Sequence, residues 1–343
     1  MNVSQTIQRV DRVVIVGGVG GTNVGESLMR AGADLGCKTV IMDAARAMSS
    51  LPLMQSLMWR LGGHRPLYLG DFSRRLVATH RFEAIKVLLV TGAGPVTHSA
   101  LKQLRAQGVI CINYSTDDPW NPAHRAKWHL RALPEYNVVF TPRRSNIGDF
   151  RALGCADVRY LPFGYDPHLF GRCEPAPGCE GPPCLFVGGA DRDRVEFFRA
   201  FIRAGGQPTL VGGYWDRHTE LRSLAIGHKS AAELCQLTAG AAVNLCLVRR
   251  ANRDGHVMRS LEIPAVGGFM IAEDTGEHRE LFGGEGECVL YFNDPAEAAR
   301  KARWALERPA ERRRMANACH ARIIGGGHTY TDRLRNMLAA VPA

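Results

Sequence analysis

The sequence predicts an α/β protein built from two successive doubly wound, Rossmann-like domains. Short apolar runs rich in β-branched residues alternate with helical stretches over residues 12–141, and again from residue 184 onward. Buried strands that alternate with helices form parallel sheets covered on both faces. A Pro- and Gly-rich stretch without periodicity separates the two series. We therefore expect domains at residues 1–170 and 184–343, joined by a linker at 171–183, that face each other across a cleft.

The individual elements follow from the same patterns. In the first domain the expected strands are 12–17, 39–42, 86–91, 109–113 and 138–141, and the expected helices are 25–35 and 96–107. In the second domain the expected strands are 184–187, 208–211, 242–248, 269–272 and 288–292. Its expected helices are 193–204, 231–237, 276–282, 295–307, 310–323 and 331–340.

Length and composition fit this organisation. The chain has 343 residues, which suits two domains of roughly 150 residues each. Apolar residues make up 45% and charged residues 22%, so two cores can be buried. No apolar run is long enough to cross a bilayer, and residues 1–11 lack the apolar centre of a signal peptide. The expected location is the cytoplasm.

The chain carries 43 Lys and Arg against 33 Asp and Glu, a net charge of +10. Such an excess favours anionic partners, of which nucleotide diphosphates and acidic lipid surfaces fit this chain and nucleic acid is not expected. The segment 300–322 combines arginines with Trp304 and Leu306. It predicts at most a weak peripheral association with anionic membranes.

Neither the cysteines nor the acidic pairs predict a metal site. Most of the ten cysteines lie within apolar runs, as buried free thiols do. Cys173, Cys179 and Cys184 lie close together, but a fourth ligand and a C-x2-C spacing are absent, so we interpret this stretch as a linker. Asp191 and Asp193 form a D-x-D pattern at a strand–helix turn, where Asp193 is expected to be the helix N-cap.

A glycine-rich turn follows the first expected strand and leads into a helix. Gly18 and Gly20 fit G-x-G, but the third position of the dinucleotide fingerprint is Asn23. The backbone amides of Gly20 and Gly21 are candidate ligands for a phosphate group. Asp43 ends the second strand, where such folds place a ribose-binding acid. Glycines required for a tight turn without any cofactor explain the pattern equally well.

Two adjacent carboxylates, Asp117 and Asp118, directly follow the fourth expected strand. They have two interpretations. Adjacent aspartates in a turn commonly cap backbone amides. Their position at the carboxyl edge of the sheet also suits groups that orient an acceptor hydroxyl, which makes both candidate catalytic residues.

The segment 241–280 carries the strongest functional pattern. Asp254 and Glu262 are eight residues apart, and Arg259 between them opens an expected short helix over residues 259–265. Glu262 lies in an apolar run, where an unpaired carboxylate is costly, and it is a candidate for hydrogen bonds to ribose hydroxyls. Guanidinium groups that match phosphate oxygens come from Arg249, Arg250, Arg253 and Arg259.

Several blocks, taken together and in order, resemble the CgeB-like glycosyltransferases, which are related to the retaining group-1 glycosyltransferases. The blocks are DDP at 117–119, YNVVFTPRRSNIGDFRALGCADVRYLPFGYDPHLF at 136–170, FVGG at 186–189, RSLEIPAVGGFMIAED at 259–274 and HTYTDRL at 328–334. The resemblance covers most of the chain.

This resemblance implies the GT-B fold and transfer, with retention, from a nucleoside-diphosphate sugar to an acceptor, without metal or cofactor. Glu262 matches the family's second acid, which binds the donor ribose. Asp254 matches the first acid, which approaches the sugar, although the family usually has Glu there. Arg194 matches the basic residue that holds the diphosphate, next to the FVGG turn with Gly188 and Gly189.

Two alternatives stay open at this point. The Gly-rich turn and Asp43 would fit an NAD(P)-dependent oxidoreductase. Aspartate in place of glutamate at position 254 would fit a relative that binds nucleotide sugars without catalysis.

Overall fold

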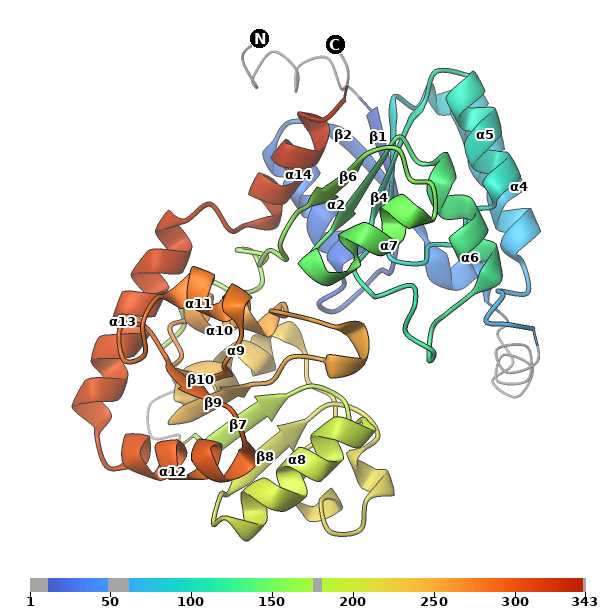
Figure 1. Ribbon diagram of the computed structural model, residues 1–343. Coiled ribbons are helices and arrows are strands. Elements are labelled where there is room, and N and C mark those ends of the chain that lie inside the picture. The colour runs from blue at the N-terminus through green and yellow to red at the C-terminus, as the bar shows by residue number, and fades with distance from the viewer. Residues whose placement is uncertain (1–11, 49–61, 175–180, 342–343) are drawn as a thin grey trace. The chain divides into compact units, whose positions relative to one another are not determined.

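The computed structural model describes residues 12–48, 62–174 and 181–341, and its chain divides into two compact units (Figure 1). The first unit comprises Met1–Phe163, Ala251–Asp254 and Tyr330–Ala343, and the second comprises Gly164–Arg250 and Gly255–Thr329. The main division thus falls a few residues before the expected boundary at 170. Two later segments also return to the first unit. Cys179 of the expected linker lies outside the described residues.

The first unit contains a six-stranded parallel sheet with the order β2-β1-β3-β4-β5-β6. Its strands are β1 (Arg12–Gly17), β2 (Lys38–Asp43), β3 (Val87–Thr91), β4 (Ile110–Tyr114), β5 (Val138–Thr141) and β6 (Val158–Tyr160). The central strands are almost entirely buried, as expected for a parallel sheet covered on both faces. The five expected strands are confirmed, and β6 is an additional edge strand.

Helices cover this sheet. They are α2 (Val24–Asp34), α4 (Leu69–Glu83), α5 (His98–Ala106), α6 (Lys127–Ala132), α7 (Ile147–Ala152) and α14 (Tyr330–Leu338), with 3-10 turns η1 (Ala44–Ala47), η2 (Leu133–Glu135) and η3 (Arg144–Asn146). Helix α4 packs against α5, and α2 packs against α14 (Figure 1). The doubly wound arrangement predicted from the sequence is confirmed for this unit.

Helix α14 is an integral part of the first unit although it lies near the end of the chain. The Thr331 hydroxyl donates to the carboxylate of Asp34 in α2 over 2.9 Å. Arg333 is 4% exposed, and its guanidinium donates to the carbonyl oxygens of Pro162, at 2.8 Å, and Phe163. Leu334 and Met337 are fully buried. Packing and hydrogen bonds therefore both hold α14 in place.

The second unit contains a five-stranded parallel sheet with the order β11-β10-β9-β7-β8. Its strands are β7 (Cys184–Val187), β8 (Pro208–Val211), β9 (Val243–Cys246), β10 (Met270–Glu273) and β11 (Leu290–Phe292). Its helices are α8 (Arg192–Arg203), α9 (Ala231–Gly240), α10 (Arg259–Val266), α11 (Gly276–Phe282), α12 (Pro295–Leu306) and α13 (Pro309–Gly325). Three further 3-10 turns are η4 (Trp215–Arg217), η5 (Arg222–Leu224) and η6 (Arg250–Asn252), the last of which extends into the 251–254 segment.

The helices of the second unit pack on one another, and α12 also contacts α13. Helix α8 contacts α12, while α10 contacts α9 and α13. At α8, the Trp215 ring meets the rings of Phe186 and Phe198 edge to face, with centroids 6.1 and 5.6 Å apart, and the Phe186 and Phe198 rings are tilted at 4.9 Å. Such aromatic pairs add stability beyond their buried area, so this cluster anchors α8 to the strand that precedes it.

The start of α8 corrects one expectation. The helix begins at Arg192, and the carboxylate of Asp191 accepts a hydrogen bond from the Arg194 amide over 3.0 Å. Asp191 is therefore the N-cap, and Asp193, which was expected to cap the helix, lies in its first turn. Ser, Thr, Asp and Asn all suit a cap, so the choice between two aspartates two residues apart depends on where the backbone turns.

Within the described ranges, no helix combines the length and apolarity required to cross a membrane.

Candidate functional site

The second sheet has a switch point between β7 and β9. Strand β7 pairs with β8 on one side and with β9 on the other, so the loops that follow β7 and β9 lead to helices on opposite faces. In open α/β sheets, ligands bind in the crevice outside the carboxyl ends of such strands. The crevice here lies beside Gly188 and Gly189 after β7 and the residues after Cys246 in β9.

The Gly188–Gly189 turn is tightly packed at Gly188, whereas a Cβ atom at Gly189 would make only an ordinary contact with the Gly213 carbonyl, at 3.5 Å. A Cβ atom at Gly188 would lie 2.9 Å from the Phe186 ring. The Gly188 carbonyl accepts a hydrogen bond from the indole of Trp215 over 2.8 Å. The Gly189 carbonyl accepts one from the Arg194 guanidinium over 3.0 Å. The turn therefore holds Arg194 at the crevice, and the donor-binding role of Gly188, Gly189 and Arg194 stays a prediction.

Two arginines converge on one carboxylate at this crevice. The Nε atoms of Arg194 and Arg249 lie 3.7 and 3.9 Å from the same oxygen of Asp191. Arg194 also lies over the Phe186 ring, with its guanidinium carbon 5.3 Å from the centroid. The Asp191 carboxylate already accepts a hydrogen bond from one backbone amide at the N-terminus of α8. The guanidinium groups are therefore the main anion-binding groups here. Paired arginine forks of this kind suit phosphate oxygens, and a phosphate here would compete with Asp191, whose oxygen lies beyond hydrogen-bond distance of both Nε atoms.

A buried acid–base pair lies at the start of α10. Glu262 is 3% exposed and accepts a hydrogen bond from Arg259, whose guanidinium carbon lies 5.6 Å from the Phe170 centroid. Burial raises the pKa of Glu262, and the charge of Arg259 opposes this shift. Glu262 is thus paired. The free-energy cost of burying an unpaired carboxylate, which made Glu262 a candidate ligand for ribose in the sequence analysis, therefore no longer supports that role. The donor roles of both residues remain predictions.

A neutral histidine supports the beginning of α10. His278 is fully buried, and burial lowers its pKa to about 4. Its Nδ1 lies 2.7 Å from the Glu273 carbonyl oxygen, so Nδ1 carries the proton, and Nε2 accepts from the Ser260 hydroxyl at 2.8 Å. Ser260 Oγ in turn accepts a hydrogen bond from the Val257 amide over 3.0 Å. Sequence reasoning missed this network, because nothing local pairs positions 260 and 278.

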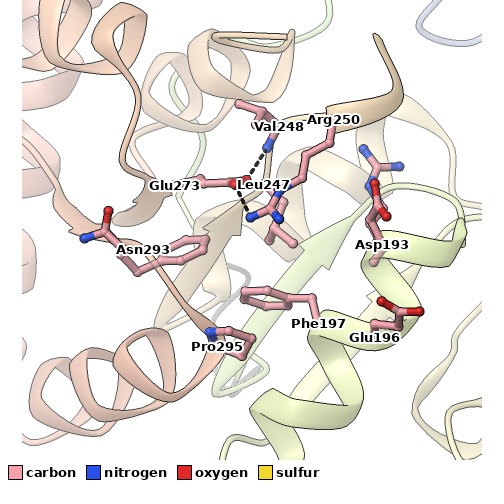
Figure 2. Close-up of a pocket in the computed structure, with 11 residues that line it drawn as sticks. Asp193, Glu196, Phe197, Leu247, Val248, Arg250, Glu273, Asn293 and Pro295 are labelled. Atoms are coloured by element: carbon pink, nitrogen blue, oxygen red, sulfur yellow. Dashed lines mark hydrogen bonds and ion pairs between the residues drawn. The ribbon is translucent and has the colours of Figure 1, made fainter. Parts of the chain in front are cut away.

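A pocket of about 230 Å³ adjoins the crevice and shares Arg194 with it (Figure 2). Phe197 of α8 and Leu247 after β9 provide apolar walls. The Glu273 carboxylate at the end of β10 accepts hydrogen bonds from the Val248 amide over 3.1 Å and from Arg250 over 2.9 Å. Apolar walls with a few fixed polar groups are typical of a small-molecule site.

The other predicted residues of this segment lie in the first unit. Asp254, with a side chain 3% exposed, accepts a hydrogen bond from Arg143, whose side chain is 1% exposed. Arg143 also donates to the carbonyl oxygens of Ser115, at 3.1 Å, and Thr116, at 2.7 Å. Asp254 therefore belongs to a different unit from Glu262. The geometry gives Asp254 a structural task, and its catalytic role remains a prediction.

Arg253 and Asp118 form a second ion pair of the first unit. Arg253 donates to both oxygens of Asp118, at 2.6 and 3.0 Å, and to Asp149 over 2.7 Å. Asp118 is 1% exposed and also caps the Trp120 amide over 2.9 Å, which confirms the capping interpretation of this aspartate. A phosphate at Arg253, as the sequence predicted, would compete with two carboxylates. The neighbouring Asp117 is exposed and accepts a hydrogen bond from Asn252 over 3.2 Å.

The Gly-rich turn after β1 holds a carboxylate of its own. Gly20 and Gly21 have φ values of +86° and +59°, which favour glycine. The Gly20 amide donates to Glu26 in the first turn of α2, and Glu26 also pairs with Arg30 over 3.0 Å. In a dinucleotide site, phosphates occupy this place. An acid there opposes phosphate binding at the predicted Gly20 and Gly21 amides.

Asp43 is likewise engaged with its own backbone. Its carboxylate accepts a hydrogen bond from the Ala45 amide over 3.0 Å and so caps the turn η1. Together with Glu26, this arrangement weakens the case for an NAD(P) site in the first unit.

The described residues contain no group of three or more His, Cys, Asp or Glu side chains arranged to hold a metal ion. Cys184 is buried in β7, and Cys173 accepts a hydrogen bond from Gln236 over 3.1 Å.

Comparison with known proteins adds two findings. Residues 192–339 match a family model described as glycosyl transferase-like. No curated protein sequence matches the chain significantly.

Several solved structures resemble the whole chain. Sucrose-phosphate synthase from Thermosynechococcus elongatus is 15% identical with a TM-score of 0.70, covering 96% of this chain and 97% of that one. Anabaena HepE in complex with UDP-glucose is 14% identical with a TM-score of 0.63, covering 96% and 98%. A trehalose-6-phosphate synthase is 13% identical with a TM-score of 0.64, covering 97% and 99%. The chain therefore has the GT-B fold of these enzymes, and its residues 192–339 carry a glycosyl transferase-like sequence.

Proposed function

We propose that this protein is a glycosyltransferase that uses a nucleoside-diphosphate sugar as donor. The observation that carries the proposal is the convergence of Arg194 and Arg249 at the switch point of the second sheet. The glycosyl transferase-like match begins at this point of the chain. Anabaena HepE, which has the same fold, is described in complex with UDP-glucose, which supports a nucleotide sugar as the ligand here.

In this proposal, each group at the crevice has a task. Arg194 and Arg249 bind the diphosphate and stabilise the negative charge that develops when it leaves. Glu262 accepts hydrogen bonds from the ribose hydroxyls, and the adjoining pocket receives another part of the donor. Because arginines can neutralise the leaving group, we propose that transfer requires neither a metal ion nor a cofactor.

Retention of the anomeric configuration is part of the proposal. Its support is that trehalose-6-phosphate synthase, which shares the fold, is described as transferring with retention. We further propose a cytoplasmic location, because the nine described cysteines are free thiols and eight of them are buried. Relationship to the CgeB-like branch also remains a proposal, supported by the sequence blocks given above.

Replacing Arg194 with alanine should weaken UDP binding about tenfold or more and leave uridine binding nearly unchanged. The reason is that the lost charge-assisted hydrogen bonds reach only the phosphates, and such bonds contribute about 1.5–3 kcal/mol. Titration calorimetry in excess EDTA measures the affinities for UDP and uridine and also tests whether UDP binding requires a metal ion.

Arg192 provides the matched control. It lies on the same helix, its side chain is 88% exposed, and it pairs with Glu196. The Arg192→Ala variant should bind UDP like the unchanged protein. Equal losses in both variants, equal losses of UDP and uridine, or loss of UDP binding in EDTA would contradict the proposed site.

We also propose a salt-sensitive association of the α12–α13 region with anionic lipid. Trp304 and Leu306 are 37% and 38% exposed, and Arg308 lies over the Trp304 ring at 5.0 Å. Met315, in contrast, is buried in the core of the unit. A basic surface with little exposed apolar area binds anionic lipid weakly and loses this binding in salt.

Flotation with vesicles of phosphatidylcholine, with and without phosphatidylglycerol, tests this association. We expect recovery only with phosphatidylglycerol and only at low salt. Absence of lipid-dependent recovery at low salt would show that the surface serves solubility alone.

A further inference from the structure

The first unit contains a cavity of about 310 Å³ at the carboxyl edge of its sheet. The loops that follow β2, β3 and β4 line it, through Ala44, Ala93 and Asp117 respectively. Of the eleven described residues that line it, eight are Ala, Met, Pro or Trp, and the other three are His64, Asp117 and His124. None of these residues belongs to the donor crevice described above.

The walls of the cavity are firmly held. The indole of Trp128 donates a hydrogen bond to the His64 carbonyl over 3.0 Å, so the ring contributes apolar surface while its only polar atom is satisfied. His64 has a φ of +60°, and its Nδ1 lies 2.8 Å from the Arg125 carbonyl oxygen. A left-handed residue other than glycine persists only where its surroundings fix it, and such strain concentrates at binding sites.

The described lining favours a ligand with an apolar ring over a strongly hydrated one. A monosaccharide ring would place several hydroxyl groups against Met48, Pro66 and Pro95, and a buried hydroxyl without a partner costs roughly 1–3 kcal/mol. A planar apolar ring would instead gain contact with Trp128 and the prolines. The volume lies at the lower end of the range for small-molecule sites, which suits one or two fused rings.

One carboxylate, that of Asp117, can orient a ligand in the cavity. Asp117 is exposed, and the Asn252 amide donates to its Oδ1 over 3.2 Å. Asp118 beside it is buried and held by Arg253. A ligand in the cavity therefore meets Asp117, and a hydroxyl group is the simplest neutral partner for a carboxylate.

We propose that this cavity binds a small hydroxylated aromatic molecule as the acceptor, with its ring against Trp128 and its hydroxyl hydrogen-bonded to Asp117. The role of this molecule as an acceptor rests on the proposed function, whereas its binding in the cavity does not. In the transfer, the acceptor oxygen forms a bond to the anomeric carbon of the donor, and the bond from that carbon to the diphosphate oxygen breaks. The hydroxyl proton passes to the released nucleoside diphosphate, so atoms and charges balance.

Fluorine NMR of 4-fluorophenol in the presence of the full-length protein tests the proposal. We expect line broadening that unlabelled phenol reverses, and much less broadening with 2-deoxy-2-fluoroglucose. Ala93 lines the cavity and is exposed, so the Ala93→Phe variant fills the cavity from its rim without entering the core. It should weaken 4-fluorophenol binding at least fivefold, and Asp117→Asn should weaken it more than it weakens fluorobenzene binding.

The matched control is Ala106→Phe, at the exposed end of α5 and outside the cavity lining. It should bind 4-fluorophenol like the unchanged protein. Absence of 4-fluorophenol binding, equal binding of the fluorinated sugar, or unchanged binding in Ala93→Phe would each overturn the proposal. UDP titration of the unchanged protein distinguishes failure of this proposal from failure of the proposed function. A protein that binds 4-fluorophenol but not UDP would contradict the donor site, and one that binds UDP but not 4-fluorophenol would contradict this cavity.

Discussion

Replacing Arg143 with methionine should lower the free energy of unfolding by about 3–5 kcal/mol. The side chains of Arg143 and Asp254 are 1% and 3% exposed, so the change removes the arginine that pairs with a buried carboxylate. The carbonyl oxygens of Ser115 and Thr116 also lose their guanidinium donor. Chemical denaturation of the full chain, followed by circular dichroism, measures the loss.

Two further variants make the result specific. Arg159→Met removes an exposed arginine that pairs with Asp157 in the same unit, and exposed pairs contribute about 0–1 kcal/mol. The double variant Arg143→Met, Asp254→Leu replaces both charges with apolar groups and should recover a large part of the lost stability. A loss in Arg143→Met no larger than that in Arg159→Met would show that the pair does not hold the 251–254 segment.

Replacing Glu262 with glutamine should weaken UDP binding by roughly ten- to a hundredfold, because hydrogen bonds from ribose hydroxyls to a carboxylate contribute about 1.5–3 kcal/mol. The variant keeps the shape of the side chain. Titration calorimetry measures the change, and circular dichroism verifies that the variant is folded. The exposed Glu307, 72% exposed at the end of α12, gives the matched control Glu307→Gln, which should bind UDP normally.

The same residue predicts a dependence on pH. Burial raises the pKa of Glu262, so its carboxylate takes up a proton at a higher pH than an ordinary glutamate. Only the charged form makes the strong bonds, and UDP affinity should therefore fall as pH decreases through this raised pKa. The glutamine variant has no such group and should lose that part of the pH dependence. Unchanged affinity in a folded variant would show that Glu262 serves α10 rather than the donor.

Strands were predictable from the sequence where a short, continuous run of apolar and β-branched residues identifies a buried strand by itself. Residues 12–17, 138–141 and 184–187 match β1, β5 and β7 without adjustment. Strand β6 was missed because three residues at a sheet edge, one of them an exposed arginine, form no such run. Helix α4 was missed because five charged residues and His80 interrupt the apolar positions of its 15-residue sequence.

The positions of candidate site residues were predictable where the sequence pattern is local, while their roles in binding stay predictions. Gly188, Gly189 and Arg194 lie within one strand–helix turn, and their arrangement follows from it. Asp254 and Glu262 were grouped by their spacing along the chain, yet the two residues fold with different units. Which unit a loop packs on depends on distant partners such as Arg143, and no local pattern in the sequence specifies them.

The composition of the first unit has a consequence for the order of biosynthesis. Domains generally fold as units during synthesis, the N-terminal one first. Here the first unit includes α14, and the hydrogen bonds from Thr331 and Arg333 join that helix to residues made long before it. The ribosome therefore completes every element of the second unit before it supplies the last helix of the first. A nascent chain that ends before residue 330 lacks α14 and leaves one face of α2 uncovered. We therefore expect chaperones to bind ribosome-attached chains that end before residue 330, and to bind less to chains that include α14.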